Sequence, residues 1–176
     1  MIPQRLESIW QAIHQNRANL GEKARQIMKD ENLTPLARRK QVRELYRQAI
    51  EKHKHLLHQW KNELDTFRQS LVRTTLKPRS DGERQLYLQV QKLTGEDWDN
   101  FVQSALSVQD EPTLRAAALT AFVRGDWRTF EKTAQAVAGV SDMLEFERTF
   151  GEIADPQAKF ALQVELSKPT LPAEFE

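Results

Sequence analysis

The chain has 176 residues, a net charge of +1 and no cysteine. That length suffices for one fair-sized domain or two small ones. Without cysteine the chain forms no disulfide, thiolate nucleophile or cysteine-ligated zinc site. No apolar run approaches the length that spans a bilayer, and the first residues lack the basic and apolar blocks of a signal peptide. We therefore expect a soluble protein that is not secreted through a signal peptide and has no membrane partner.

The small net charge conceals an uneven distribution along the chain. Residues 1–80 contain 17 Lys and Arg against 8 Asp and Glu, a net charge of +9. Residues 81–176 contain 9 and 17, a net charge of −8. A basic half joined to an acidic half indicates a charged partner for each, or association between the two halves.

The first helix is expected over about residues 5–28. Asn16 and Arg17 interrupt its apolar face, and polar residues at such positions usually fix the register of packing helices. The apolar face itself repeats every seven residues, at Leu6, Ile13, Leu20 and Ile27.

A capped turn precedes a second helix, predicted from Leu36 to about Leu76. Thr34 is a natural N-cap, and Pro35 fits the first helical position because its missing N–H is not needed there. We expect the two helices to form an antiparallel coiled-coil hairpin over residues 1–76. Apolar spacings of four and three residues mark the coiled-coil seam of the second helix, at Tyr46, Ile50, His53, Leu57, Trp60, Leu64, Phe67 and Leu71.

The two helices differ in length, about 36 Å against about 60 Å at 1.5 Å per residue. Folding about the turn places Leu6 near Leu57. Beyond that point the second helix lacks a partner in the first, so its apolar side chains must pack on the C-terminal half or on another subunit. We name these side chains the apolar overhang and predict that they bind a partner: Trp60, Leu64, Phe67 and Leu71.

A wholly basic row follows the same helix at intervals of seven residues. It favours an acidic partner helix or a solvated face, and the alternative is contact with a nucleic-acid backbone. The members of this basic row are Lys40, Arg47, Lys54, Lys61 and Arg68.

A linker at residues 77–82, rich in turn-forming residues, separates the hairpin from a predicted helical domain at 83–167. Asp97-Trp98 and Phe101 recur 29 residues later as Asp126-Trp127 and Phe130, which indicates a degenerate repeat of helical hairpins. A solenoid and a compact bundle both remain open. The six short helices are expected in three pairs, at 82–93 with 96–108, 111–124 with 126–138, and 142–154 with 156–167.

The tail, residues 168–176, contains two prolines and is expected to be extended. Leu171 and Phe175 give it the pattern of a short docking peptide, although a frayed end is the favoured interpretation.

Catalytic and metal-binding patterns are weak. His55 and His58 share a helix face, but no carboxylate follows at ligand spacing, and His53 is interpreted as a hydrogen-bonded interior histidine. The carboxylates of residues 96–99 lie in the opening turn of a predicted helix, where negative charge complements the helix dipole. Neither they nor Glu145 and Glu147 show the pocket that catalytic carboxylates need. No glycine loop for a phosphate occurs. We expect no enzyme, no metal and no cofactor.

The segment Asn32-Leu33-Thr34-Pro35, followed by a basic run and a long amphipathic helix, resembles small tailed-bacteriophage proteins encoded among head-assembly genes. The resemblance covers about residues 1–76. It implies a structural, scaffolding or connector role without catalysis, in the virion or the host cytoplasm.

The sequence thus predicts an all-α protein: an antiparallel coiled-coil hairpin followed by a six-helix globular, hairpin-repeat-like domain. The expected function is structural or assembly-related, through self-association or contacts with other virion proteins. The alternative is nucleic-acid binding by the basic face of the helix at 36–76.

Overall fold

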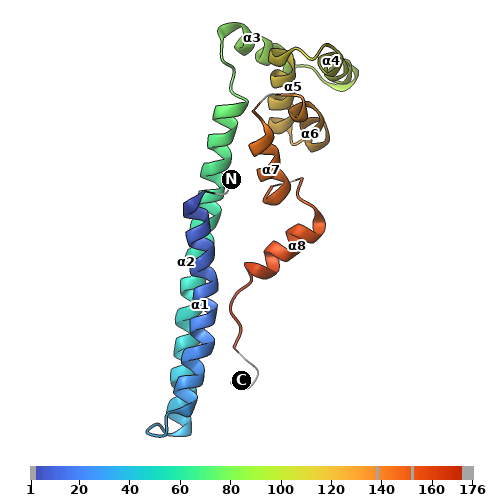
Figure 1. Ribbon diagram of the computed structural model, residues 1–176. Coiled ribbons are helices and arrows are strands. Elements are labelled where there is room, and N and C mark those ends of the chain that lie inside the picture. Colours follow the sequence, from blue (N-terminus) through green and yellow to red (C-terminus); the bar gives the residue numbers. More distant parts are fainter. Residues whose placement is uncertain (1–2, 138, 152, 172–176) are drawn as a thin grey trace. The chain divides into compact units, whose positions relative to one another are not determined.

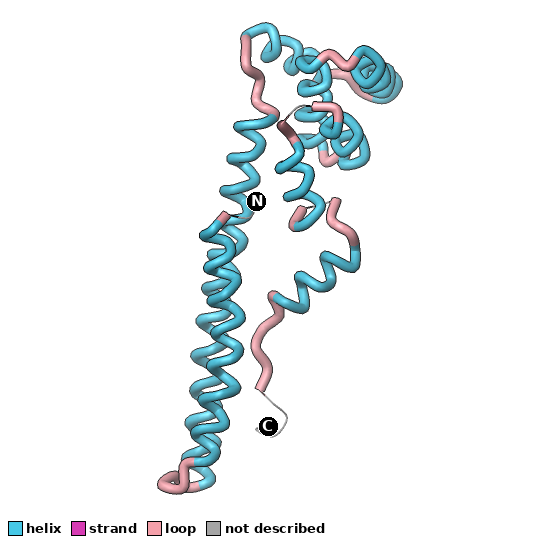
Figure 2. The backbone as a smooth tube through the Cα atoms, in the orientation of Figure 1, coloured by secondary structure: helices cyan, strands magenta, loops and turns pink. Residues whose placement is uncertain are grey.

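The computed structural model describes residues 3–137, 139–151 and 153–171. It is all-helical, with 80% helix, and the described ranges contain eight helices and no strand (Figures 1 and 2). The prediction of an all-α chain is confirmed. The helices are α1 Gln4–Lys29, α2 Pro35–Thr75, α3 Asp81–Val90, α4 Gly95–Val108, α5 Glu111–Arg124, α6 Trp127–Gln135, α7 Ser141–Thr149 and α8 Pro156–Glu165.

Local signals place most helix ends within a few residues of the predicted ones. Thr34 Oγ1 accepts a hydrogen bond from the Ala37 N–H at 3.3 Å, so Thr34 caps α2 as expected and Pro35 opens the helix. Asp110 caps α5 in the same way, through the Thr113 N–H. Gly125 ends α5 with φ of 70°, a left-handed conformation that glycine adopts without a Cβ penalty.

The chain divides into two compact units. Unit 1 takes in the chain up to Thr66 together with the segment from Ala161 onward, and unit 2 runs from Phe67 to Phe160. This division differs from the predicted domains, which placed the boundary in the linker at 77–82. It also reduces the charge contrast, because unit 1 has 14 Lys and Arg against 11 Asp and Glu, and unit 2 has 12 against 14.

In unit 1, α1 and the first part of α2 lie side by side and run antiparallel (Figures 1 and 2). The Asn16 side-chain amide donates a hydrogen bond to the Ala49 carbonyl oxygen at 2.9 Å, and Asn16 itself is buried. This bond fixes one residue of α1 opposite one residue of α2, which is the register role predicted for a polar residue at this position.

The residues at the centre of α2's buried face differ from the predicted seam. Ile50 and Leu57 are only half-buried, whereas the fully buried row is one residue earlier, at Val42, Ala49 and Leu56. Seven residues beyond Leu56 the row reaches the half-buried Glu63, so a charged residue interrupts its apolar pattern. Ala49 also lacks the bulk of a typical seam residue, and the structure uses that small side chain to admit Asn16.

Unit 2 is built around α5. Its residues from Leu114 to Ala121 are all buried, and α3, α4 and α6 pack against it. A helix with so little polar surface must be enclosed, and the alanine run lets its neighbours approach closely. α3 therefore packs mainly on α5, whereas the sequence had paired it with α4.

The structure retains the 29-residue sequence repeat only in part. Asp126 is the N-cap of α6, but its counterpart Asp97 lies inside the first turn of α4, which begins at Gly95. Phe130 is fully buried, whereas Phe101 is half-buried.

Candidate partner-binding surfaces

The apolar overhang is occupied by contacts within the chain. In unit 1, Trp60 is 3% exposed and its ring lies 5.4 Å from that of Trp10 on α1, while Leu64 is half-buried. In unit 2, Phe67 makes an edge contact with Phe146, with ring centroids 5.4 Å apart. Leu71 is buried.

The expectation that Trp60 has no partner in the first helix is therefore wrong. Arg5, near the start of α1, forms an ion pair with Glu63 at 3.2 Å, so α1 reaches beyond Trp60. Counting seven-residue steps from the turn had placed Leu6 opposite Leu57, several residues short of the observed register. The pairing of Asn16 with Ala49 sets the true alignment.

The basic row, like the apolar overhang, is divided between unit 1 and unit 2. Lys40, Arg47, Lys54 and Lys61 are exposed on unit 1. Arg47 and Lys54 form ion pairs with acidic residues one turn earlier, Glu44 at 2.9 Å and Glu51 at 2.8 Å. The hydrogen bond from Arg47 lowers the pKa of Glu44 below its ordinary value. The exposed face thus carries both signs of charge, which weakens its attraction for a polyanion.

Arg68, the last member of the basic row, is half-buried in unit 2. Its guanidinium binds Glu147 through two hydrogen bonds, at 2.6 and 3.0 Å, and the Glu147 side chain is fully buried. The same guanidinium lies over the rings of Phe122 and Trp127, at 5.0 and 5.4 Å from their centroids. This bidentate pair fastens the end of α2 to α7, so Arg68 is a structural residue here.

The histidines show no arrangement for a metal. His55 and His58 are exposed and lie beside Gln59 and Asn62, one turn further along α2. In the part of the chain that the structure describes, no group of three His, Asp or Glu side chains converges on a metal-sized space. The carboxylates of residues 96–99 are exposed in the first turn of α4.

A cluster of side chains in unit 1, which the sequence did not predict, holds the chain's C-terminal segment. Arg17 donates hydrogen bonds to the carbonyl oxygens of Val164 and Ser167, and to the Ser167 hydroxyl at 3.1 Å. His53 Nε2 lies 3.1 Å from the Leu166 carbonyl oxygen, and His14 Nε2 lies 3.2 Å from a Glu165 carboxylate oxygen. We name Arg17 and His53 the segment clamp.

His53 is the interior member of the segment clamp and is only 2% exposed. Burial lowers the pKa of His53 below its ordinary value, the bond to Leu166 opposes that effect, and the nearby charge of Arg17 adds to it. The neutral imidazole is therefore favoured, with the proton on Nε2 so that it donates to the Leu166 carbonyl. The interpretation of His53 as a hydrogen-bonded interior histidine is confirmed.

Two sequence signals point to this cluster. Arg17 occupies an apolar position of α1, and the tail carries the pattern of a docking peptide. The contacts come from residues 164–167, just before the tail predicted at 168–176. Leu171 is half-buried, and Phe175 lies outside the described residues.

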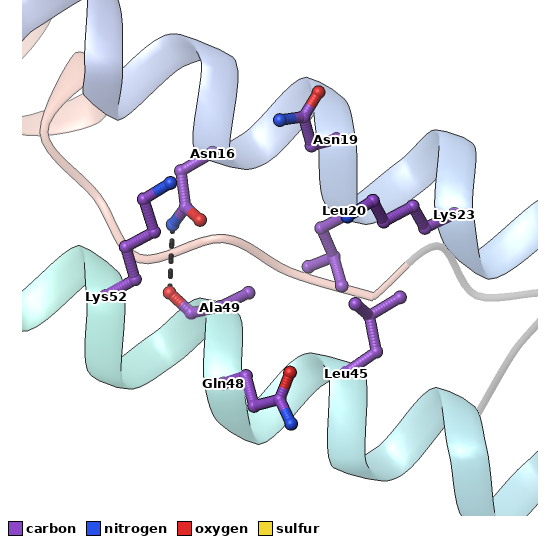
Figure 3. Close-up of a pocket in the computed structure, with 8 residues that line it drawn as sticks. All are labelled: Asn16, Asn19, Leu20, Lys23, Leu45, Gln48, Ala49 and Lys52. Atoms are coloured by element: carbon purple, nitrogen blue, oxygen red, sulfur yellow. Dashed lines mark hydrogen bonds between the residues drawn. The ribbon is translucent and has the colours of Figure 1, made fainter.

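A groove of about 150 Å³ also lies between α1 and α2. Its walls present amide and ammonium groups rather than carboxylates, and Figure 3 shows the Asn16 amide reaching across to Ala49 with the extended C-terminal segment passing behind. The volume is below that of typical small-molecule sites, about 300–1,000 Å³. The lining residues are Asn16, Asn19, Leu20, Lys23, Leu45, Gln48, Ala49 and Lys52.

Unit 2 has a wider concavity of about 820 Å³ beside the start of α3. Three basic side chains, Lys77, Arg79 and Arg84, line it together with Tyr87. Arg79 also lies 3.6 Å from Glu111, so part of this positive charge is already paired.

Within the described residues, no helix is both long and apolar enough to cross a membrane. No protein-family model matches the chain, and neither the curated proteins nor the solved structures contain a match.

Proposed function

We propose that this protein is a non-catalytic structural or assembly protein that acts through protein–protein contacts. The observation that supports it best is the segment clamp, in which two side chains of the α1–α2 pair hold the C-terminal end of α8 and the turn after it by their carbonyl oxygens. The last carbonyl oxygens of a helix have no partner within the helix, so side chains of another element can bind them. In this proposal the α1–α2 pair works as a coiled-coil arm, and the helices of unit 2 form a globular body.

A role in a bacteriophage head or virion is the specific form of this proposal. It rests on the resemblance of residues 1–76 to head-assembly proteins. Mass spectrometry of purified particles or assembly intermediates, from a phage that encodes the chain, is the direct test. Recovery of the chain in stoichiometric amounts supports the role, and its absence from both contradicts it.

Self-association provides the general test. Sedimentation velocity of the full chain at increasing concentration is expected to show species larger than a monomer. Sedimentation as a monomer at every concentration would contradict assembly through copies of this chain.

Nucleic-acid binding is the second candidate, and the concavity at α3 is the observation that favours it. Basic side chains beside an aromatic ring suit a phosphate backbone and a stacked base. A gel-shift assay should show binding that weakens steeply with salt and is lost in Lys77→Glu/Arg84→Glu. If Lys54→Glu/Lys61→Glu removes the shift instead, the basic row is the binding surface. No shift at low salt rules out both.

A further inference from the structure

The segment clamp recognises the backbone of the C-terminal segment more than its side chains. Arg17 contacts two carbonyl oxygens, of Val164 and Ser167, and His53 contacts a third, of Leu166. Two side-chain contacts accompany them, from the Ser167 hydroxyl to Arg17 and from the Glu165 carboxylate to His14. Carbonyl oxygens are the same in every copy of the chain, so nothing in this chemistry requires the segment to come from the same molecule as the clamp.

The clamp also retains unused hydrogen-bonding capacity. Arg17 Nε and His53 Nδ1 are buried, and neither has a hydrogen-bond partner within the described ranges. A buried polar atom without a partner weakens the arrangement that contains it. The segment is therefore held by fewer hydrogen bonds than the clamp could make.

The helix that leads into the segment is not fixed by a core. None of the α8 side chains is buried, in contrast to α5. Phe160 is 67% exposed and Val164 is 51% exposed, and these two apolar residues lie one turn apart on the same face of α8. Covering these two exposed apolar side chains on a further surface would be favourable.

We propose that a second copy of this chain supplies residues 161–171 to the clamp, so that copies are linked by exchange of their C-terminal segments. The inference rests on the proposed assembly function and names its partner and its surface. Exchange of an identical element is a low-cost route to an oligomer, because it reuses contacts that the single chain already contains. In the exchanged form, α8 crosses between copies, where its Phe160–Val164 face can be covered.

Isotope-mixed cross-linking tests the exchange directly. Unlabelled and ¹⁵N-labelled full chains are unfolded together, refolded as a mixture and treated with an amine-reactive cross-linker. Lys52 is next to His53, and Lys168 is next to Ser167, so a Lys52–Lys168 cross-link reports the docked segment. Mass spectrometry is expected to find cross-links that join a labelled and an unlabelled peptide. Cross-links within one isotope only, or no Lys52–Lys168 cross-link, would overturn the proposal.

Three variants show whether the clamp causes the exchange. Arg17→Ala should abolish the mixed-isotope cross-links. Arg5→Ala is the matched control, because it removes an arginine of the same helix whose partner is Glu63. Ser167→Ala should also keep the cross-links, since the carbonyl contacts survive. Mixed cross-links that persist in Arg17→Ala contradict a role for the clamp.

Sedimentation of the same samples separates the two proposals. An oligomer with cross-links in one isotope only disproves the exchange and leaves the assembly function standing. A monomer disproves both.

Discussion

Units 1 and 2 both bury polar side chains, but they satisfy them differently. In unit 2 the buried Glu147 carboxylate pairs with the Arg68 guanidinium, which also lies over two aromatic rings. Unit 1 directs Asn16, Arg17 and His53 at main-chain carbonyl oxygens. The contrast lies in the acceptor, because the Arg68 pair depends on one particular carboxylate, whereas the segment clamp uses carbonyl oxygens that every residue carries.

The largest expected effect lies at the end of the α1–α2 pair. Trp60→Ala should destabilise the protein by about 3–5 kcal/mol, because it removes a buried ring that packs on Trp10. Urea unfolding followed by circular dichroism measures the loss. Leu64→Ala, at a half-buried position on the same helix, should cost clearly less. Equal and small effects would mean that α1 does not cover Trp60.

The buried ion pair of unit 2 comes next. Glu147→Ala should cost about 3 kcal/mol, because it leaves the Arg68 guanidinium without its carboxylate. Arg68 is 30% exposed and can recover some hydration, so the lower end of the range for broken buried pairs is expected. The exposed Glu145→Ala is the control and should stay within about 0.5 kcal/mol. A Glu147→Ala variant as stable as this control would show that the pair is dispensable.

A smaller effect is expected from the register bond of unit 1. Asn16→Ala removes the hydrogen bond to the Ala49 carbonyl and should cost about 1 kcal/mol, the usual net value of one such bond. Thermal unfolding beside Asn19→Ala, a neighbouring amide on α1 that lacks the cross-helix bond, measures the difference. If the two variants have the same melting temperature, the register does not depend on Asn16.

The smallest expected effect is a pH dependence centred on His53. Its pKa in the folded protein is lowered from 6.5, so the unfolded chain binds more protons as the pH falls through that value. Stability should be complete above 6.5 and should decrease as the pH falls below it. A second histidine, His14, lies 3.2 Å from a Glu165 carboxylate oxygen beside the same segment, so the comparison is made in His14→Gln, where His53 is the remaining histidine of the cluster.

The pH test needs a matched variant. Unfolding midpoints from pH 7.5 to 5.5 should fall in the His14→Gln background and fall less when His53→Leu is added, with Arg17 unchanged in both. Parallel curves would show that His53 does not titrate differently in the folded and unfolded states.

The sequence predicted the helices well because caps and turn residues are local signals. Thr34, Asp110 and Gly125 set helix ends through contacts within a few residues. The register of α1 against α2 was not predictable by counting, since it depends on Asn16 meeting the small Ala49 across the pair.

The candidate surfaces were harder to predict, because a seven-residue spacing does not distinguish an exposed residue from one that later parts of the chain cover. Arg68 and Lys61 have the same spacing within the basic row, yet only Arg68 meets a buried carboxylate, 79 residues further along the chain. The segment clamp likewise depends on contacts between residues about 110 to 150 positions apart. Two sequence features signalled it, Arg17 in an apolar face and the docking-peptide pattern of the tail.

The solution mass of the full chain, determined by light scattering beside that of Arg17→Ala, tests the central claim most directly. The wild type is expected to have a mass of at least two chains of 20.5 kDa, and Arg17→Ala to shift toward the mass of one. A wild-type mass of 20.5 kDa at every concentration, or an oligomer unaffected by Arg17→Ala, would contradict the claim that the C-terminal segment joins copies of this protein.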